Sequence, residues 1–248
     1  MNPGGLMTAL RFLTILPLGR GCELDGRGMA RAMAWFPVAG ALMGGALVGL
    51  DGLLPGRLPG PVVSVLLVAL LALVTGGLHL DGFADTLDGM YGGRGDRERT
   101  LAIMKDSRTG AMGVIGLVLL LLLKYESVEN LRGTLRVPGL LLMPVMARFS
   151  QVLMSYRAEY ARREGSLAQP FVEHIGAGHV AFAATFTAGL SFWAAGVKGL
   201  VVLCAVVVLT YLAREYFHAR IGGITGDTIG AVSEFNEVLV LLVMFLVE

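Results

Sequence analysis

Three aspartates, Asp81, Asp85 and Asp88, stand close together in the first half of the sequence. Their spacing of i, i+4 and i+7 places them on one face of an α-helix. Like charges at this spacing repel, so the pattern predicts a cation among them. Carboxylate oxygens select a hard metal ion, and Mg²⁺ is usually held by a few carboxylates with water and substrate phosphates. We therefore expect a Mg²⁺ site here, which His79 can join. The alternative is a structural cluster paired with the basic loop that follows.

That loop is rich in glycine and carries five basic residues, Arg94, Arg97, Arg99, Lys105 and Arg108. Glycine lets backbone amides approach an anion, and Arg or Lys neutralises phosphate oxygens. We interpret Arg97 and Arg99 as surface charges. Lys105, Asp106 and Arg108 come directly before an apolar run, where a helix start and phosphate-binding residues would face the same interface as the aspartates.

Two further features carry charge in or beside apolar segments. Arg148 falls inside an apolar run, where a charge needs a ligand or a structural ion pair, and we expect a functional role. Asp227 and Glu234 are seven residues apart in the segment 222–237 and would share a helix face. They would add a second acidic group that completes a metal site or a general-base site.

The composition indicates the kind of fold that holds these residues. The chain has 248 residues, of which 55% are hydrophobic and 16% charged, with 35 glycines and a mean hydropathy of +0.70. Soluble domains carry about 25% charged residues. Glycine is also frequent in membrane helices that pack closely. The chain is therefore predicted to be all-α, a polytopic membrane bundle in a single domain over residues 1–248.

A membrane-spanning helix needs about 20 apolar residues. Six segments fit this requirement with few or no charges: 32–50, 61–78, 109–123, 137–156, 175–197 and 199–213. A seventh segment, 238–247, is long enough only if it begins earlier and includes Glu234 and Glu237. We therefore expect six or seven spans.

The orientation follows from the excess of Lys and Arg in alternate loops, which marks the cytoplasmic side. One side holds Arg11, Arg20, Arg27, Arg31, Arg94, Arg97, Arg99, Lys105, Arg108, Arg157, Arg162, Arg163, Arg214 and Arg220. The other side holds Arg57, Lys124, Arg132, Arg136 and Lys198. This asymmetry predicts a cytoplasmic N-terminus and places the aspartates at the cytoplasmic face.

The sequence is less compatible with a nucleic-acid-binding protein, a disulfide-stabilised protein or a protein with a cleaved signal peptide. A net charge of +1 gives no overall signature of nucleic-acid binding. Two cysteines, Cys22 and Cys204, do not make a disulfide framework. No cleavable signal peptide is expected, because the first apolar run is preceded by about thirty residues with four arginines.

Three separated segments resemble the cobalamin synthase family, the adenosylcobinamide-GDP ribazoletransferases. They are Gly-Gly-Leu-His-Leu-Asp-Gly-Phe-Ala-Asp-Thr-Leu-Asp-Gly at 76–89, Met-Lys-Asp-Ser-Arg-Thr-Gly at 104–110 and Gly-Gly-Ile-Thr-Gly-Asp-Thr-Ile-Gly-Ala at 222–231. The segment Leu-Arg-Phe-Leu-Thr-Ile-Leu-Pro at 10–17 is similar to the opening of that family. The resemblance extends over essentially the whole chain.

The resemblance implies a Mg²⁺-dependent transferase in the cytoplasmic membrane of a prokaryote. Its reaction joins adenosylcobinamide-GDP to α-ribazole or α-ribazole 5′-phosphate, gives adenosylcobalamin or its phosphate, and releases GMP. Other enzymes of cobalamin assembly are then candidate partners, besides the lipid bilayer.

The same resemblance assigns roles to the residues singled out above. Asp81, Asp85 and Asp88 would hold one or two Mg²⁺ ions against the diphosphate. Lys105, Arg108, Arg94 and Arg148 would neutralise phosphate oxygens, and Asp227, Glu234 or one of the three aspartates would take the proton from the acceptor hydroxyl. The sequence leaves the identity of this base open.

Two other functions are compatible with acidic residues at span ends. An intramembrane prenyltransferase also uses Asp-rich motifs with Mg²⁺, but it would release pyrophosphate in place of GMP. An ion-coupled transporter would place carboxylates on an ion pathway. Transporters often contain two related halves, and the 81–88 motif has no second copy in the sequence.

Overall fold

The computed structural model describes residues 4–18, 26–54, 56–162 and 169–247, and within these ranges it is helical with no named strand. The α-helices are α1 (Gly4–Leu13), α2 (Gly26–Ala34), α3 (Phe36–Leu53), α4 (Gly60–Val74), α5 (Leu78–Gly92), α6 (Arg97–Ile103), α7 (Ala111–Asn130), α8 (Arg136–Ser155), α9 (Gln169–His174), α10 (Ala177–Ile221) and α11 (Gly226–Leu246). A short 3₁₀-helix, Gly133–Leu135, precedes α8. The predicted all-α class is confirmed.

Five of these helices, α3, α7, α8, α10 and α11, are long and apolar enough to cross a membrane, where α8 is counted together with the 3₁₀ turn before it. The bent pair of α4 and α5 makes a sixth candidate span. The last span does begin early, because α11 starts at Gly226 and includes Glu234 and Glu237. The chain is a multi-pass membrane protein.

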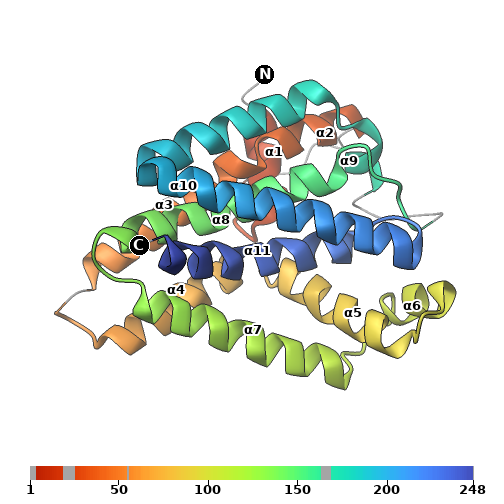
Figure 1. The fold of residues 1–248 in the computed structure, drawn as a ribbon, viewed down its shortest axis with the longest axis horizontal. Helices are drawn as coiled ribbons and strands as arrows, with labels where there is room; N and C mark the ends of the chain where they lie inside the picture. Colours follow the sequence, from red (N-terminus) through yellow and green to blue (C-terminus); the bar gives the residue numbers. More distant parts are fainter. Residues whose placement is uncertain (1–3, 19–25, 55, 163–168, 248) are drawn as a thin grey trace.

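The longest helix, α10, is two helices joined at a glycine. Gly196 has φ 60° and ψ −141°, which is non-helical, and the chain reverses direction there (Figure 1). Only glycine adopts such a backbone at little cost. The two spans predicted on either side of Lys198 therefore exist, with the turn two residues before that lysine.

The expected span 61–78 is shorter than predicted. Helix α4 ends at Val74, and the axis turns by 87° into α5. Gly76 and Gly77 make the corner with φ values of 61° and 70°, which side chains disfavour. The acidic face of α5 thus belongs to a separate helix at the end of a broken span.

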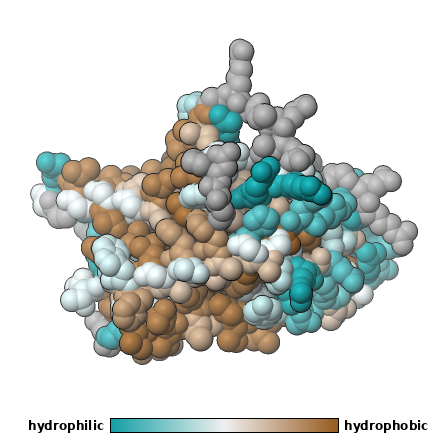
Figure 2. Space-filling view, turned by 90° about the horizontal axis from the view of Figure 1, so that it is seen from above, coloured by the Kyte–Doolittle hydropathy of each residue, from teal (hydrophilic) through white to brown (hydrophobic). Residues whose placement is uncertain are grey.

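The two ends of the bundle differ in polarity. Figure 1 places the α3–α4 and α7–α8 connections, the Gly196 turn and the C-terminus at one end, and α6 with the C-terminal turn of α5 at the other. Figure 2 shows hydrophilic side chains concentrated at that second end and apolar ones over the remainder of the face in view. We call the second end the polar end. There the Arg97 guanidinium donates hydrogen bonds to the backbone oxygens of Ile221 and Ala161, which hold the loops of this end together. Of the basic residues counted for this side, Arg20 and Arg163 lie outside the described residues.

Close packing of α3 against α8 depends on two glycines one turn apart. A Cβ at Gly40 would lie 2.6 Å from the carbonyl oxygen of Pro144, and one at Gly44 would lie 2.5 Å from that of Leu141. Small residues four apart let two membrane helices approach to backbone contact. These two positions fix the separation of α3 and α8.

We expect Gly44→Ala to lower the thermal unfolding temperature of the detergent-solubilised protein, because its Cβ has no room; overpacking costs about 1–3 kcal/mol. The matched control is the neighbouring Gly45→Ala, whose Cβ meets nothing within 4 Å and which should leave stability equal or higher. Equal unfolding temperatures for both variants would contradict the close approach.

Candidate active site

The site begins where α5 crosses α11. A Cβ at Gly82 would lie 3.0 Å from the Cα and the carbonyl oxygen of Asp227, and one at Gly230 would lie 3.3 Å from the Cα of His79. A glycine from each helix thus faces the backbone of the other. This crossing brings the motif at 76–89 and the motif at 222–231 together.

Asp88 joins the motif at 104–110 to the motif at 76–89. The backbone N–H of Gly110 donates to Oδ2 of Asp88 at 2.6 Å, and that of Gly113 donates to Oδ1 at 2.9 Å. These amides are at the start of α7, where backbone donors lack partners within the helix. Asp88 therefore caps α7 from a neighbouring helix, a role that its negative charge suits.

A cavity of about 330 Å³ opens beside the crossing. Its polar lining comes from His79, Asp81, Gln151, Arg162 and Asp227. A second, more open cavity of about 610 Å³ shares Asp81 with the first and includes Thr109 of the 104–110 loop. Asp81 is therefore accessible from both, and all three motifs contribute to this region.

The predicted carboxylates are near one another but are not clustered tightly. Asp85 lies within electrostatic reach of Asp81, Asp88 and Asp227. Asp81 is exposed and Asp85 half-buried. Among the described residues, no group of three or more His, Cys, Asp or Glu side chains is close enough to hold a metal ion by itself. The arrangement suits an ion that takes one or two carboxylates and completes its shell with water and phosphate, as Mg²⁺ does.

Arg162 is a site residue that the sequence analysis did not single out. Its Nη2 donates to Oδ2 of Asp227 at 2.6 Å, and its Nε is buried without a hydrogen-bond partner in the described part of the chain. In the sequence analysis Arg162 appears only as one of the basic residues that predict the orientation of the chain in the membrane. A guanidinium beside a carboxylate in a cavity suits an anionic ligand, because its remaining N–H groups stay available.

His79 lines the cavity, as its place in the acidic motif suggested, and Gln151 holds its ring. The amide nitrogen of Gln151 lies 3.0 Å from Nε2 of His79 and 2.8 Å from Oγ of Ser233. Because an amide nitrogen only donates, Nε2 accepts and the ring proton lies on Nδ1. Nδ1 is buried and has no partner among the described residues. A buried donor of this kind is costly unless a ligand accepts from it.

The 104–110 loop places its charged residues at the surface. Asp106 and Arg108 pair at 2.6 Å, and the Arg108 side chain is 87% exposed. Hydrogen bonds from the Arg108 side chain and backbone lower the pKa of Asp106 to about 2, so it stays ionised at physiological pH. Lys105 and Arg94 are exposed as well. These cations are at the polar end but do not line either cavity.

Arg148 and Glu234 lie in a different place, inside the bundle. Arg148 donates to Glu237, and Lys124 of α7 donates to Glu234 and, at 2.5 Å, to Glu237. All four side chains are at most 5% exposed. They form a buried charge network of two cations and two anions from α7, α8 and α11. For Arg148 this is a structural ion pair, the alternative to the functional role that the sequence analysis expects.

The position of Lys124 differs from the sequence prediction. That prediction ends the third span just before Lys124 and counts this residue among the loops of the side with fewer basic residues. Helix α7 instead continues to Asn130, and Lys124 is buried within it. Two carboxylates of α11 neutralise its charge, which is the condition under which a lysine is accepted inside a membrane bundle.

Comparisons with known proteins show the family of the chain. The family model described as "Cobalamin-5-phosphate synthase" matches residues 5–245. The chain belongs to this family. Its relatives include proteins named "Adenosylcobinamide-GDP ribazoletransferase" from Geotalea daltonii, at 46% identity over 95% of this chain and 94% of the relative, and from Pseudomonas paraeruginosa, at 42% over 97% of each. A third, from Syntrophobacter fumaroxidans, is 39% identical over 94% of this chain and 95% of the relative. No solved structure matches the chain.

The buried charge network should dominate stability. Lys124→Met leaves Glu234 and Glu237 beside each other with one cation, and we expect it to cost about 3–5 kcal/mol of unfolding free energy. The double variant Lys124→Met/Glu234→Gln removes one charge of each sign and should recover part of the loss. Thermal unfolding in detergent measures both, and a double variant less stable than the single one would refute the charge-balance account.

Proposed function

We propose that this chain is an adenosylcobinamide-GDP ribazoletransferase. It transfers the cobinamide phosphate of adenosylcobinamide-GDP to α-ribazole or its 5′-phosphate, and GMP leaves. The relatives of that name and the family support this activity. The observation that carries it is the meeting of three separated motifs, 76–89, 104–110 and 222–231, around two adjoining cavities that share Asp81.

The cavity contains what such a reaction requires of the protein. A diphosphate brings negative charge, and two residues of the cavity lining, Arg162 and His79, each have a buried N–H group without a partner among the described residues. Charge-assisted hydrogen bonds of this kind stabilise the charge that develops on a leaving phosphate. Lys105 and Arg108, exposed at the polar end, attract the same anion before it reaches the cavity.

Mg²⁺ is the proposed cofactor, and the donor set fits it. Asp81 and Asp85 have carboxylate oxygens available, whereas those of Asp88 accept from the backbone of α7. We therefore assign Asp81 and Asp85 as the ligands and Asp88 as the residue that fixes α7 beside them. When bound, the ion neutralises diphosphate oxygens as the phosphoanhydride bond breaks.

Asp227 is the preferred general base for the acceptor hydroxyl. It lines the cavity, and its pairing with Arg162 orients the carboxylate. It takes the hydroxyl proton as the oxygen forms its bond to the cobinamide phosphorus. We assign neither Glu234 nor Arg148 a role in the reaction. Both belong to the buried charge network, and neither lines the cavity.

The test of this function is GMP release by the purified protein in liposomes with adenosylcobinamide-GDP, α-ribazole 5′-phosphate and Mg²⁺. Release should need both substrates, stop on chelation, and fall at least about 100-fold in Asp85→Asn, since loss of transition-state charge stabilisation costs factors of this size. The exposed Glu98→Gln is the matched control and should keep wild-type activity.

Each alternative gives a different result. Pyrophosphate from a prenyl diphosphate, with no GMP, would support the prenyltransferase. Ion-driven uptake without turnover would support the transporter. Full activity in Asp85→Asn would leave the transferase in place and remove Asp85 from the site.

We also propose that the polar end faces the cytoplasm and that the membrane is the inner membrane. The excess of basic residues at this end supports that orientation. In a background where Cys22 and Cys204 are serine, Ser107→Cys should react with an impermeant maleimide only after the cells are permeabilised. Leu58→Cys, at the opposite end, should react in intact cells, and the reverse pattern would invert the orientation.

A further inference from the structure

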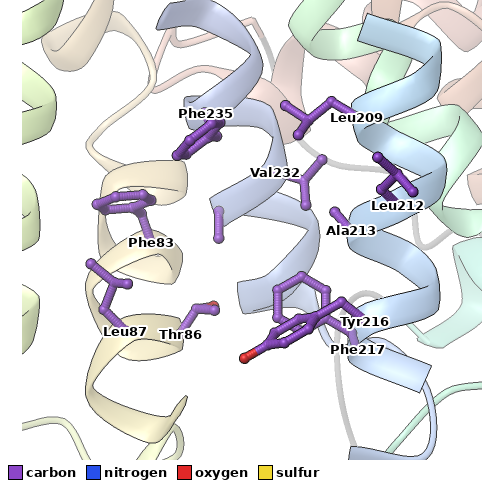
Figure 3. Close-up of a pocket in the computed structure, with 11 residues that line it drawn as sticks. Phe83, Thr86, Leu87, Leu209, Leu212, Ala213, Tyr216, Phe217, Val232 and Phe235 are labelled. Atoms are coloured by element: carbon purple, nitrogen blue, oxygen red, sulfur yellow. The ribbon is translucent and has the colours of Figure 1, made fainter. Parts of the chain in front are cut away.

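A third cavity, distinct from the two beside the proposed active site, lies on the face of α5 opposite its aspartates. It has a volume of about 340 Å³, within the usual range for ligand pockets. Side chains of α5, α10 and α11 form it, among them Phe83, Ala213 and Phe235 (Figure 3). The residues that line it include no carboxylate and no cation. We call it the lateral pocket.

The mouth of the lateral pocket faces the hydrocarbon of the bilayer. Leu212 is 64% exposed, Phe235 52% and Tyr216 48%, and all three belong to helices that can span a membrane. Large apolar side chains exposed together on membrane-spanning helices mark a surface that contacts lipid. What fills the pocket therefore enters from the membrane.

One polar group in the pocket lacks a partner. The hydroxyl of Thr86 is buried, the residue is 5% exposed, and no hydrogen-bond partner exists for it in the described part of the chain. Figure 3 shows this hydroxyl turned into the pocket, at the end where the Tyr216 hydroxyl also lies. An unsatisfied buried hydroxyl costs free energy that an acceptor on a ligand would recover.

A cation stands just beyond that end. Arg220, one turn after Tyr216 and exposed, lies over the Tyr216 ring at 5.9 Å from its centroid. Tyrosine and arginine at a helix end are typical of the level of lipid headgroups. The order along the pocket is thus a cation, then hydroxyls, then an apolar channel, which matches the phosphate, ester and acyl chain of a phospholipid.

We propose that the lateral pocket binds one phospholipid, with an acyl chain between α5, α10 and α11, an ester oxygen at Thr86 and the phosphate at Arg220. Such a lipid would fill the space between α5 and α10 and support α5 from the side opposite its aspartates. This site is independent of the proposed transferase chemistry.

The test is retention of palmitoyl-oleoyl phosphatidylglycerol by the detergent-purified chain, measured by native mass spectrometry. The wild type should retain one lipid per chain. Ala213→Trp fills the pocket and should reduce retention at least about tenfold. The near-isosteric Thr86→Val should reduce it about fivefold, the equivalent of one neutral hydrogen bond. The matched control is Val208→Trp, an exposed position of α10 outside the pocket, and it should behave as wild type.

Three results would overturn the proposal. The first is that Ala213→Trp and Thr86→Val are folded by circular dichroism and retain lipid as the wild type does. A wild-type dimer that Ala213→Trp dissociates would make the pocket an interface between copies of this chain. Oleic acid retained as well as the phospholipid, with Arg220→Gln changing neither, would reduce the occupant to a bare acyl chain.

Discussion

Lys124 and Arg148 carry positive charge inside an apolar bundle, and the carboxylates of Glu234 and Glu237 neutralise them. Water is not available there to solvate either sign, so each charge depends on the others. Because the four side chains come from α7, α8 and α11, those helices are held in one register. A shift of any of them would leave a charge unpaired at a cost that a marginally stable protein cannot absorb.

This register also sets the position of the side chains that line the cavity, although they lie at a distance from the buried charges. Helix α11 carries Glu234 and Glu237 in its middle and Asp227 in its first turn, so fixing the former fixes the latter. Helix α8 carries Arg148 and, nearly one turn later, Gln151, which holds the ring of His79 on α5. The cavity is therefore assembled from helices whose relative placement is determined inside the bundle and not by its own loops.

Much of this arrangement follows from the sequence. Charge-free runs identified the spans, and the i, i+4, i+7 pattern gave the acidic helix face of α5. Pairings between distant segments did not follow, because they depend on packing. Lys124 resembled the end of a span since its partners are 110 and 113 residues away.

Two misses had a signal that was available. The adjacent Gly76 and Gly77 mark a break in an apolar run, and they make the corner between α4 and α5. Gln151 is a polar residue within the run 137–156, where such residues have partners. Arg162 had no comparable signal, because one arginine in a basic loop is not distinguished from its neighbours.

The capping of α7 by Asp88 changes how the acidic motif is to be judged in genetics. A screen for inactive variants would collect changes at all three aspartates and group them as one class. Yet a change at Asp88 removes the anchor of a whole membrane helix, so its defect would track with protein abundance and insertion. Changes at Asp81 and Asp85 would leave abundance intact. If Asp81 and Asp85 bind the metal ion as proposed, one helical face contains two kinds of residue, and expression level separates them.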